Sequence, residues 1–154
     1  MLAVMSQSVP NPIILIDDDP DDLELFASAF NELEIVNEVV TFNNGYDALE
    51  FLKNSGRQPL FILCDINMPK VNGLDLRQMI YDDMVLRQKS IPFLFLSTAD
   101  DRIFVDKAYN LAVQGYFKKP AHLGEIKEML KAIIIYWRHS HHPNSRNKFI
   151  TRTS

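Results

Sequence analysis

Four short apolar stretches of this chain each end in a carboxylate, hydroxyl or ammonium side chain. They are residues 13–16 before Asp17 and Asp18, residues 60–64 before Asp65, residues 93–96 before Ser97, and residues 115–118 before Lys119. Short apolar runs separated by helical patterns predict buried parallel strands, and open α/β sheets bind ligands outside the carboxyl ends of their strands. The pattern therefore predicts one site at one edge of a sheet.

Carboxylates crowded at such an edge repel one another unless a cation lies among them. Asp17, Asp18 and Asp65 offer only oxygen ligands, which hard divalent metals prefer. We therefore expect a divalent metal here, with the Lys119 ammonium left to meet an anion that joins it.

Length and composition indicate one folded domain. The 154 residues, 47% of them apolar, suffice for one hydrophobic core. No apolar run reaches membrane-spanning length and residues 1–12 lack a signal-peptide pattern, so we expect a cytoplasmic protein with no membrane partner. The single cysteine, Cys64, lies in a strand pattern and is expected to be a buried, inert thiol.

Charge is divided unevenly along the chain. Residues 1–139 carry 13 basic and 20 acidic side chains, a net charge of −7, whereas residues 140–154 carry 3 basic side chains and no acid. The acidic balance argues against nucleic acid as a partner. We expect a flexible N-terminus at residues 1–11, one domain at 12–139, and a disordered basic tail at 140–154.

Strand and helix patterns alternate five times. Strands are expected at residues 13–16, 36–42, 60–65, 91–97 and 115–118. Helices are expected from Asp19, from the turn at 43–45, over about 74–83, from Asp100 with Ala112 among its core positions, and over about 123–139. Asp19 is the expected N-cap of the first helix, Pro20 its first residue, and Asp21 and Asp22 face the positive end of its dipole. The alternation predicts a parallel sheet covered on both faces.

Four motifs at the strand ends resemble those of a known family. They are Ile16-Asp17-Asp18-Asp19, Cys64-Asp65 followed by Pro69 and Gly73, Leu96-Ser97-Thr98-Ala99, and Gly115-Tyr116-Phe117-Lys118-Lys119-Pro120. Each motif alone is weak, but in this order and spacing they are specific. Over residues 12–138 the chain resembles the receiver domains of two-component response regulators, typified by the bacterial chemotaxis receiver. The interval of 22 residues from Ser97 to Lys119 matches that family.

The resemblance implies an acceptor and a metal site. Asp65 is the implied acceptor of a phosphoryl group from a phosphohistidine, which forms an aspartyl phosphate. Mg²⁺, or Mn²⁺ in its place, is implied to bind Asp18, Asp65 and the backbone carbonyl of Asn67. Asp17 is implied to act through a water on the metal.

Three further residues are implied to bind the phosphoryl group or to respond to it. Lys119 pairs with the acceptor carboxylate and then with phosphoryl oxygens, and Ser97 donates its hydroxyl to one of those oxygens. Tyr116 matches the family's switch aromatic, with half-buried packing as the alternative.

The family's fold is a flavodoxin-like, five-stranded parallel sheet of order 2-1-3-4-5 with five helices. The implied protein is a stand-alone, single-domain response regulator. It is a signalling phospho-acceptor and not an enzyme, although it assists its own phosphorylation and dephosphorylation. Its implied partners are a histidine kinase or phosphotransfer protein and a downstream target protein, reached through a switched interaction face.

Two other functions remain as alternatives. In an aspartate-nucleophile phosphatase of the haloacid dehalogenase type, Asp17 would attack and Asp19 would act as general acid, but Asp65 would have no role. The second alternative is a receiver without a target that serves as a phosphate sink.

Surplus apolar side chains predict where the interaction face lies. Residues 133–137 are apolar all round the last helix, and the fourth helix carries Phe104 and Tyr109 beyond its core positions. A homodimer through the fourth helix, fifth strand and last helix is our first expectation, a docked partner protein the second, and burial beneath the tail the third. Ala112-Val113, beside this face, stands where many receivers have Gly-Ala.

Overall fold

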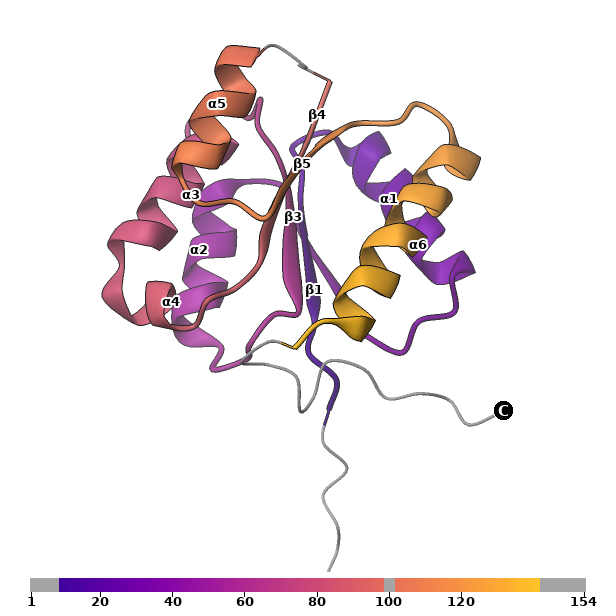
Figure 1. Cartoon of the computed structure of the whole chain (residues 1–154), viewed down its shortest axis with the longest axis horizontal. Coiled ribbons are helices and arrows are strands. Elements are labelled where there is room, and N and C mark those ends of the chain that lie inside the picture. Colours follow the sequence, from indigo (N-terminus) through magenta and orange to yellow (C-terminus); the bar gives the residue numbers. More distant parts are fainter. Residues whose placement is uncertain (1–8, 99–101, 142–154) are drawn as a thin grey trace, which may run out of the picture.

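Five parallel strands form the centre of the computed structural model, which describes residues 9–98 and 102–141 (Figure 1). The strands are β1 (Ile13–Ile16), β2 (Val39–Phe42), β3 (Phe61–Asp65), β4 (Phe93–Ser97) and β5 (Gly115–Lys118). Their order is β2-β1-β3-β4-β5 and every neighbouring pair is parallel, which confirms the predicted topology.

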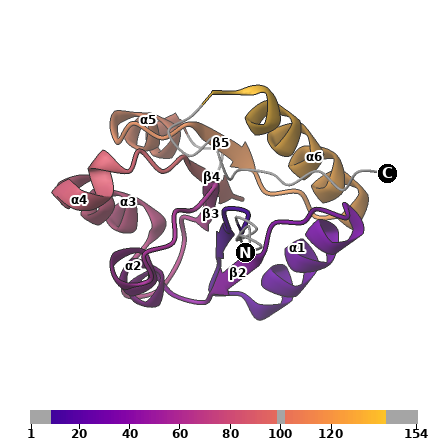
Figure 2. The ribbon, with the colours of Figure 1, turned by 90° about the horizontal axis from the view of Figure 1, so that it is seen from below.

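Six helices of the described chain cover the two faces of this sheet. They are α1 (Pro20–Glu32), α2 (Gly45–Asn54), α3 (Gly73–Asp82), α4 (Met84–Gln88), α5 (Arg102–Asn110) and α6 (Leu123–His139). Helices α1 and α6 lie on one face, and the other four lie on the opposite face (Figures 1 and 2). Over the described ranges, no helix has the length and apolar character needed to cross a membrane.

The strands supply an apolar core to both faces. Along β3, Phe61 and Leu63 pack on the α1 and α6 side, whereas Ile62 and Cys64 pack on the other. Every residue of β1, β3 and β4 is buried, as expected for parallel strands covered on both faces. The predicted burial of Cys64 is confirmed, and this burial, together with the nearby Asp65 charge, raises the pKa of the thiol.

Two helices agree closely with their sequence signals. The Asp19 carboxylate caps α1 by accepting hydrogen bonds from the N–H groups of Asp21 at 2.9 Å and Asp22 at 3.4 Å. Pro20 is the first residue of α1, where its missing N–H costs nothing. The apolar stripe of α6, including Ile126 and Leu130, packs on the sheet.

The expected total of five helices is wrong, because the structure contains the additional helix α4. Asp83 lies between α3 and α4 and serves both helices. Its N–H donates to the Met79 carbonyl at 3.2 Å, and its carboxylate accepts from the Leu86 N–H at 3.0 Å. A helix of 5 residues is too short to show an apolar period in the sequence.

Other element boundaries differ from expectation. Three strands begin later than predicted, β2 at Val39, β3 at Phe61 and β4 at Phe93. The prediction of Ala112 as a helical core position is wrong, because α5 ends before it and Ala112 is exposed. Its φ of 57° is a left-handed conformation that glycine adopts more easily. The expected helix start at Asp100 and the tail beyond residue 141 lie outside the described residues.

Candidate functional site

The carboxyl ends of four strands meet at one edge of the sheet, at the upper end of the molecule in Figure 1. β1 leads into Asp17 and Asp18, β3 ends at Asp65, β4 ends at Ser97, and β5 leads into Lys119. The N–H of Lys119 donates to the Ser97 carbonyl at 2.8 Å, just beyond the ladder pair of Ser97 and Lys118. This bond fixes the start of the loop after β5 beside β4.

The Lys119 side chain is the positive centre of the site. Its Nζ donates to Asp17 Oδ2 at 2.6 Å and to Asp22 Oδ2 at 2.9 Å, and it lies 3.5 Å from Asp65 Oδ2. The side chain is only 8% exposed. One ammonium therefore joins the loops after β1 and β5, the first turn of α1 and the end of β3.

Asp22 is a member of this site that the sequence analysis missed. The helix dipole accounts for an acid at this position without any further role. One signal was nevertheless available, because side chains on a helix tilt toward its N-terminus. Asp22 is the third residue of α1, so this tilt directs its carboxylate back toward the strand ends.

Asp17, Asp18 and Asp65 form a cluster that suits a metal ion. One oxygen from each carboxylate lies within 4.8 Å of the others. Asp17 and Asp65 are buried, and Asp18 is more open to solvent. Carboxylate oxygens at this spacing are suitable ligands for Mg²⁺ or Mn²⁺, and water can fill the remaining positions. The donor set therefore fits the expected divalent metal.

Burial controls the charges in the cluster. It raises the pKa of the Asp17 and Asp65 carboxyl groups, although the Lys119 ammonium partly offsets both shifts. Burial also works against the charged form of Lys119, but its hydrogen bonds to Asp17 and Asp22 outweigh burial and raise its pKa. The ammonium thus stays charged at neutral pH, while the buried carboxylates favour an additional cation.

The loop after β3 packs directly against the backbone of Asp65. Gly73 begins α3, and its N–H donates to the Ile66 carbonyl at 2.9 Å. A β-carbon at position 73 would lie 2.4 Å from the Asp65 carbonyl oxygen and 2.8 Å from a ring carbon of Phe95. Glycine is therefore needed for this close approach, which holds the loop containing Asn67 beside Asp65.

The remaining predicted site residues lie around the cluster. Asn67 is exposed and follows Asp65 by two positions. Ser97 is fully buried at the end of β4. Tyr116 is half-buried opposite Phe95 on the neighbouring strand, with 6.3 Å between the ring centroids. Tyr116 thus makes the packing contact that was the alternative to a switch role, and the switch role stays a prediction.

Comparisons with known proteins agree with this geometry. The family model of the response regulator receiver domain matches residues 13–131. Response regulator Rcp1 of Synechocystis sp. is 29% identical over 133 residues, which cover 83% of this chain and 89% of Rcp1. The crystal structure of the phosphorylated cyanobacterial phytochrome response regulator RcpA has a TM-score of 0.77 at 29% identity, covering 87% of this chain and 98% of RcpA. The Mn²⁺-bound form of Rcp1 has a TM-score of 0.74 at 26% identity, covering 86% of this chain and 98% of that chain.

The chain belongs to the response regulator receiver domain family of two-component signalling. The matched residues include all five strands and the four strand ends that form the site. This membership decides the class of protein in favour of a receiver over a phosphatase of the haloacid dehalogenase type.

Proposed function

We propose that this protein is a response regulator that accepts a phosphoryl group on Asp65. The observation that carries the proposal is the position of Asp65 at the end of the central strand, clustered with Asp17 and Asp18. Its carboxylate lies 3.5 Å from the Lys119 ammonium. A carboxylate so placed can attack phosphorus while nearby positive charge balances the phosphoryl oxygens. The phosphorylated state of the similar protein RcpA supports this proposal.

The proposed donor is the phosphohistidine of a histidine kinase or a phosphotransfer protein. An Asp65 oxygen bonds to phosphorus as the phosphorus–nitrogen bond breaks, and the histidine nitrogen keeps the electron pair and takes up a proton. Lys119 holds the phosphoryl oxygens as a point charge, and the Ser97 hydroxyl donates to one of them. The protein is thus a signalling phospho-acceptor that assists its own phosphorylation, and its own dephosphorylation when water attacks.

Asp18, Asp65 and the backbone carbonyl of Asn67 are the proposed ligands of Mg²⁺, for which Mn²⁺ can substitute, and Asp17 acts through a bound water. When bound, the metal supplies positive charge that offsets the crowding of carboxylate and phosphoryl oxygens. The contact of Gly73 with Asp65 keeps the Asn67 loop close to these carboxylates. The Mn²⁺-bound structure of the similar Rcp1 supports the assignment.

The proposed output face is formed by α5, β5 and α6. Its exposed apolar side chains are between 43% and 65% exposed, and they are Ile103, Tyr109, Ile135 and Tyr136. Phe104 is not among them: it is half-buried against the core, which corrects the expectation for that residue. A groove of about 320 Å³ lies beside β5 and α6, lined in part by Phe117 and Trp137. This surface supports a homodimer as the first proposal and a docked target protein as the second.

Ser97 and Tyr116 are the proposed link between Asp65 and that face. Ser97 ends β4 and Tyr116 lies on the adjacent β5, so a pull on the Ser97 hydroxyl acts next to the strand that carries Tyr116. Phosphorylation would then shift an existing equilibrium at the α5–β5–α6 surface. A phosphate sink without a target remains the second candidate, but the exposed apolar side chains favour a partner. We place the protein in the cytoplasm, in keeping with its buried free thiol.

Phosphotransfer from the sensor kinases of the source organism tests the proposal. The wild-type chain is expected to take label from a cognate kinase, whereas Asp18→Ala should lose both metal binding and label. Ser97→Ala should accept label but fail to change its self-association or target binding. Equal loss of label in both variants would contradict this division of roles.

Sedimentation tests the proposed homodimer. Ile135→Glu should weaken self-association and leave phosphorylation of Asp65 intact. A wild type that stays monomeric, with and without a phosphoryl mimic, would exclude the dimer.

A further inference from the structure

The Lys119 ammonium is shared unequally among its acidic neighbours. Its Nζ is 2.6 Å from Asp17 and 2.9 Å from Asp22, but 3.5 Å from Asp65. The two shorter distances are those of charge-assisted hydrogen bonds, and the third is at the limit of a hydrogen bond. The ammonium therefore lies toward the α1 side of the site and away from the proposed acceptor.

Asp22 differs from the other acids in its contacts. It is outside the group of three carboxylates whose spacing suits a metal. Its side chain is 33% exposed, yet its carboxylate meets a lysine that is 8% exposed. The backbone N–H groups of both Asp21 and Asp22 donate to the Asp19 cap, so both residues serve the start of the helix. They differ in their side chains, because the Asp22 carboxylate meets Lys119 whereas Asp21 is exposed.

We propose that Asp22 is a positioning residue that holds the Lys119 ammonium on the α1 side and so restrains its transfer to a phosphoryl group on Asp65. This inference rests on the proposed function. A phosphoryl group bonded to Asp65 and the carboxylate of Asp22 attract the same ammonium. Every phosphorylation event must therefore draw Lys119 against the pull of Asp22, and the reverse event returns it.

Removing the Asp22 charge should release this restraint. With Asp22→Asn, Lys119 is held by Asp17 and is freer to approach Asp65. We expect the maximal rate of phosphorylation by acetyl phosphate to rise about threefold, the size expected for loss of one partly exposed ion pair. In that reaction an Asp65 oxygen bonds to phosphorus, the phosphorus–oxygen bond to the acetyl group breaks, and acetate leaves. The aspartyl phosphate of Asp22→Asn should also have a longer lifetime than that of the wild type.

The test compares wild type, Asp22→Asn and the matched control Asp21→Asn, which removes the same charge from the same helical turn. Initial rates are measured over a range of acetyl phosphate concentrations with Mg²⁺. Weaker repulsion of the anionic donor should lower the half-saturating concentration in both variants. Only Asp22→Asn should raise the maximal rate, and Asp22→Glu should bring it back toward wild type. An unchanged or lower maximal rate in Asp22→Asn would overturn the inference.

A second measurement reads the lysine position without any phosphorylation. In the metal-free protein, the side-chain NMR signal of Lys119 should shift in Asp22→Asn and stay unchanged in Asp21→Asn. If the Lys119 signal of Asp22→Asn is the same as that of Asp21→Asn, the result would count against the inference. If the wild type takes no label at all, the proposed function fails and the inference fails with it. If the wild type is labelled and Asp22→Asn behaves as Asp21→Asn, only the inference fails.

Discussion

The buried polar groups at the two ends of the sheet interact in different ways. At the carboxyl ends, acids crowd around Lys119. At the amino ends the buried polar contact is neutral: the Asn37 amide donates to the Asn11 carbonyl at 2.8 Å, and both residues are buried. The N–H of Ile13 likewise donates to the Glu38 carbonyl at 2.8 Å. The ion pair of Arg57 and Glu38, at 2.8 Å, also lies at this end, but its Glu38 side chain is 60% exposed.

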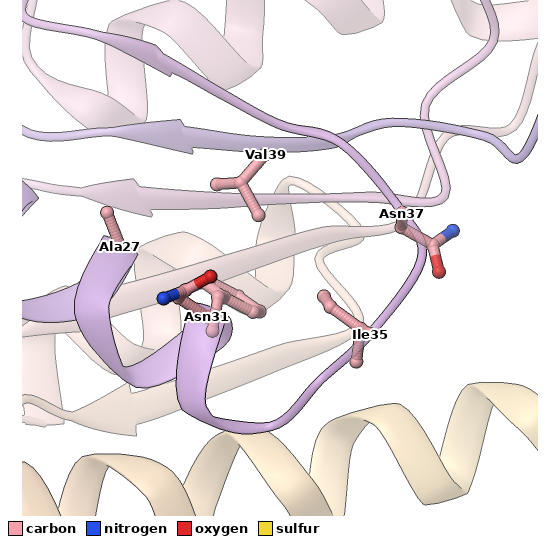
Figure 3. Close-up of a pocket in the computed structure, with 6 residues that line it drawn as sticks. Ala27, Asn31, Ile35, Asn37 and Val39 are labelled. Carbon is pink, nitrogen blue, oxygen red and sulfur yellow. The ribbon is translucent and has the colours of Figure 1, made fainter.

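Figure 3 shows the amino end, where Asn37 and Ile35 precede β2 and Ala27 and Asn31 lie on α1. The hollow between them measures about 220 Å³, and none of its lining residues is charged. The two ends therefore contribute differently. The amino end contributes to stability, whereas the charged carboxyl end holds groups suited to chemistry, whose repulsion lowers stability until a cation joins them.

The largest expected effect tests whether the charged end also depends on close packing. Gly73→Ala should destabilise the protein by about 3 kcal/mol, because the added β-carbon collides with the Asp65 backbone. Phosphorylation should be lost as Asp65 is displaced. Denaturant unfolding and acetyl phosphate labelling measure the two effects. Gly124→Ala is the control, since a β-carbon there meets nothing within 4 Å beyond its chain neighbours and its own helix backbone, and normal labelling of Gly73→Ala would contradict the packing role.

The next effect belongs to the amino end. Asn37→Ala should lower the free energy of unfolding by about 1–2 kcal/mol, because the buried Asn11 carbonyl loses its amide donor. The labelling of Asp65 should stay at the wild-type rate. Asn31→Ala, an exposed change beside the same hollow, should leave both quantities nearly unchanged. A loss of labelling in Asn37→Ala would break the separation between the two ends.

At the carboxyl end, replacing a buried polar residue should stabilise the protein, which is the opposite of the effect expected for Asn37→Ala. Burial raises the pKa of Asp65, so its contribution to stability is fully present below the ordinary carboxyl pKa and is lost as pH rises through the raised value. In chelator at pH 7, Asp65→Asn should therefore be about 1 kcal/mol more stable than wild type. The difference should vanish as pH falls below about 4. A variant that is less stable than wild type at neutral pH would show that the carboxylate is held favourably.

The smallest effect lies in the turn that leads into β5. Ala112→Gly should raise the free energy of unfolding by about 0.5 kcal/mol. Glycine removes the strain of the left-handed backbone, and this gain slightly exceeds the entropic cost of a more flexible unfolded chain. Labelling should not change. Thermal and denaturant unfolding check this, with Ala132→Gly on the helix α6 as a control that should destabilise. Destabilisation by Ala112→Gly would show that the turn is relaxed as it stands.

The grouping of Asp17, Asp18, Asp65 and Lys119 could be predicted because the carboxyl ends of parallel strands meet at one edge. Four apolar runs ending in polar residues were enough to place these side chains together. Asp22 could not be assigned in the same way, because helix capping and the helix dipole explain an acid there equally well. Its bond with Lys119 depends on how α1 docks, which no local pattern specifies.

The errors in the fold have similar physical causes. Helix α4 is a single capped turn created by Asp83, and such a turn carries no periodic signal. Ahead of β2, which begins at Val39, the Asn37 amide donates to the Asn11 carbonyl, a long-range bond that the apolar pattern of residues 36–42 does not reveal. The placement of Ala112 failed because an alanine extends a helical pattern in a sequence even where the chain turns with positive φ. An apolar pattern reveals none of these three features: a local cap, a long-range bond and a left-handed turn.

Mass spectrometry of the protein treated with acetyl phosphate tests whether Asp65 accepts the phosphoryl group. We predict one phosphoryl group, located on Asp65, formed with Mg²⁺ and absent in chelator or in Asp65→Asn. A phosphoryl group on Asp17, or undiminished labelling of Asp65→Asn, would show that Asp65 is not the acceptor.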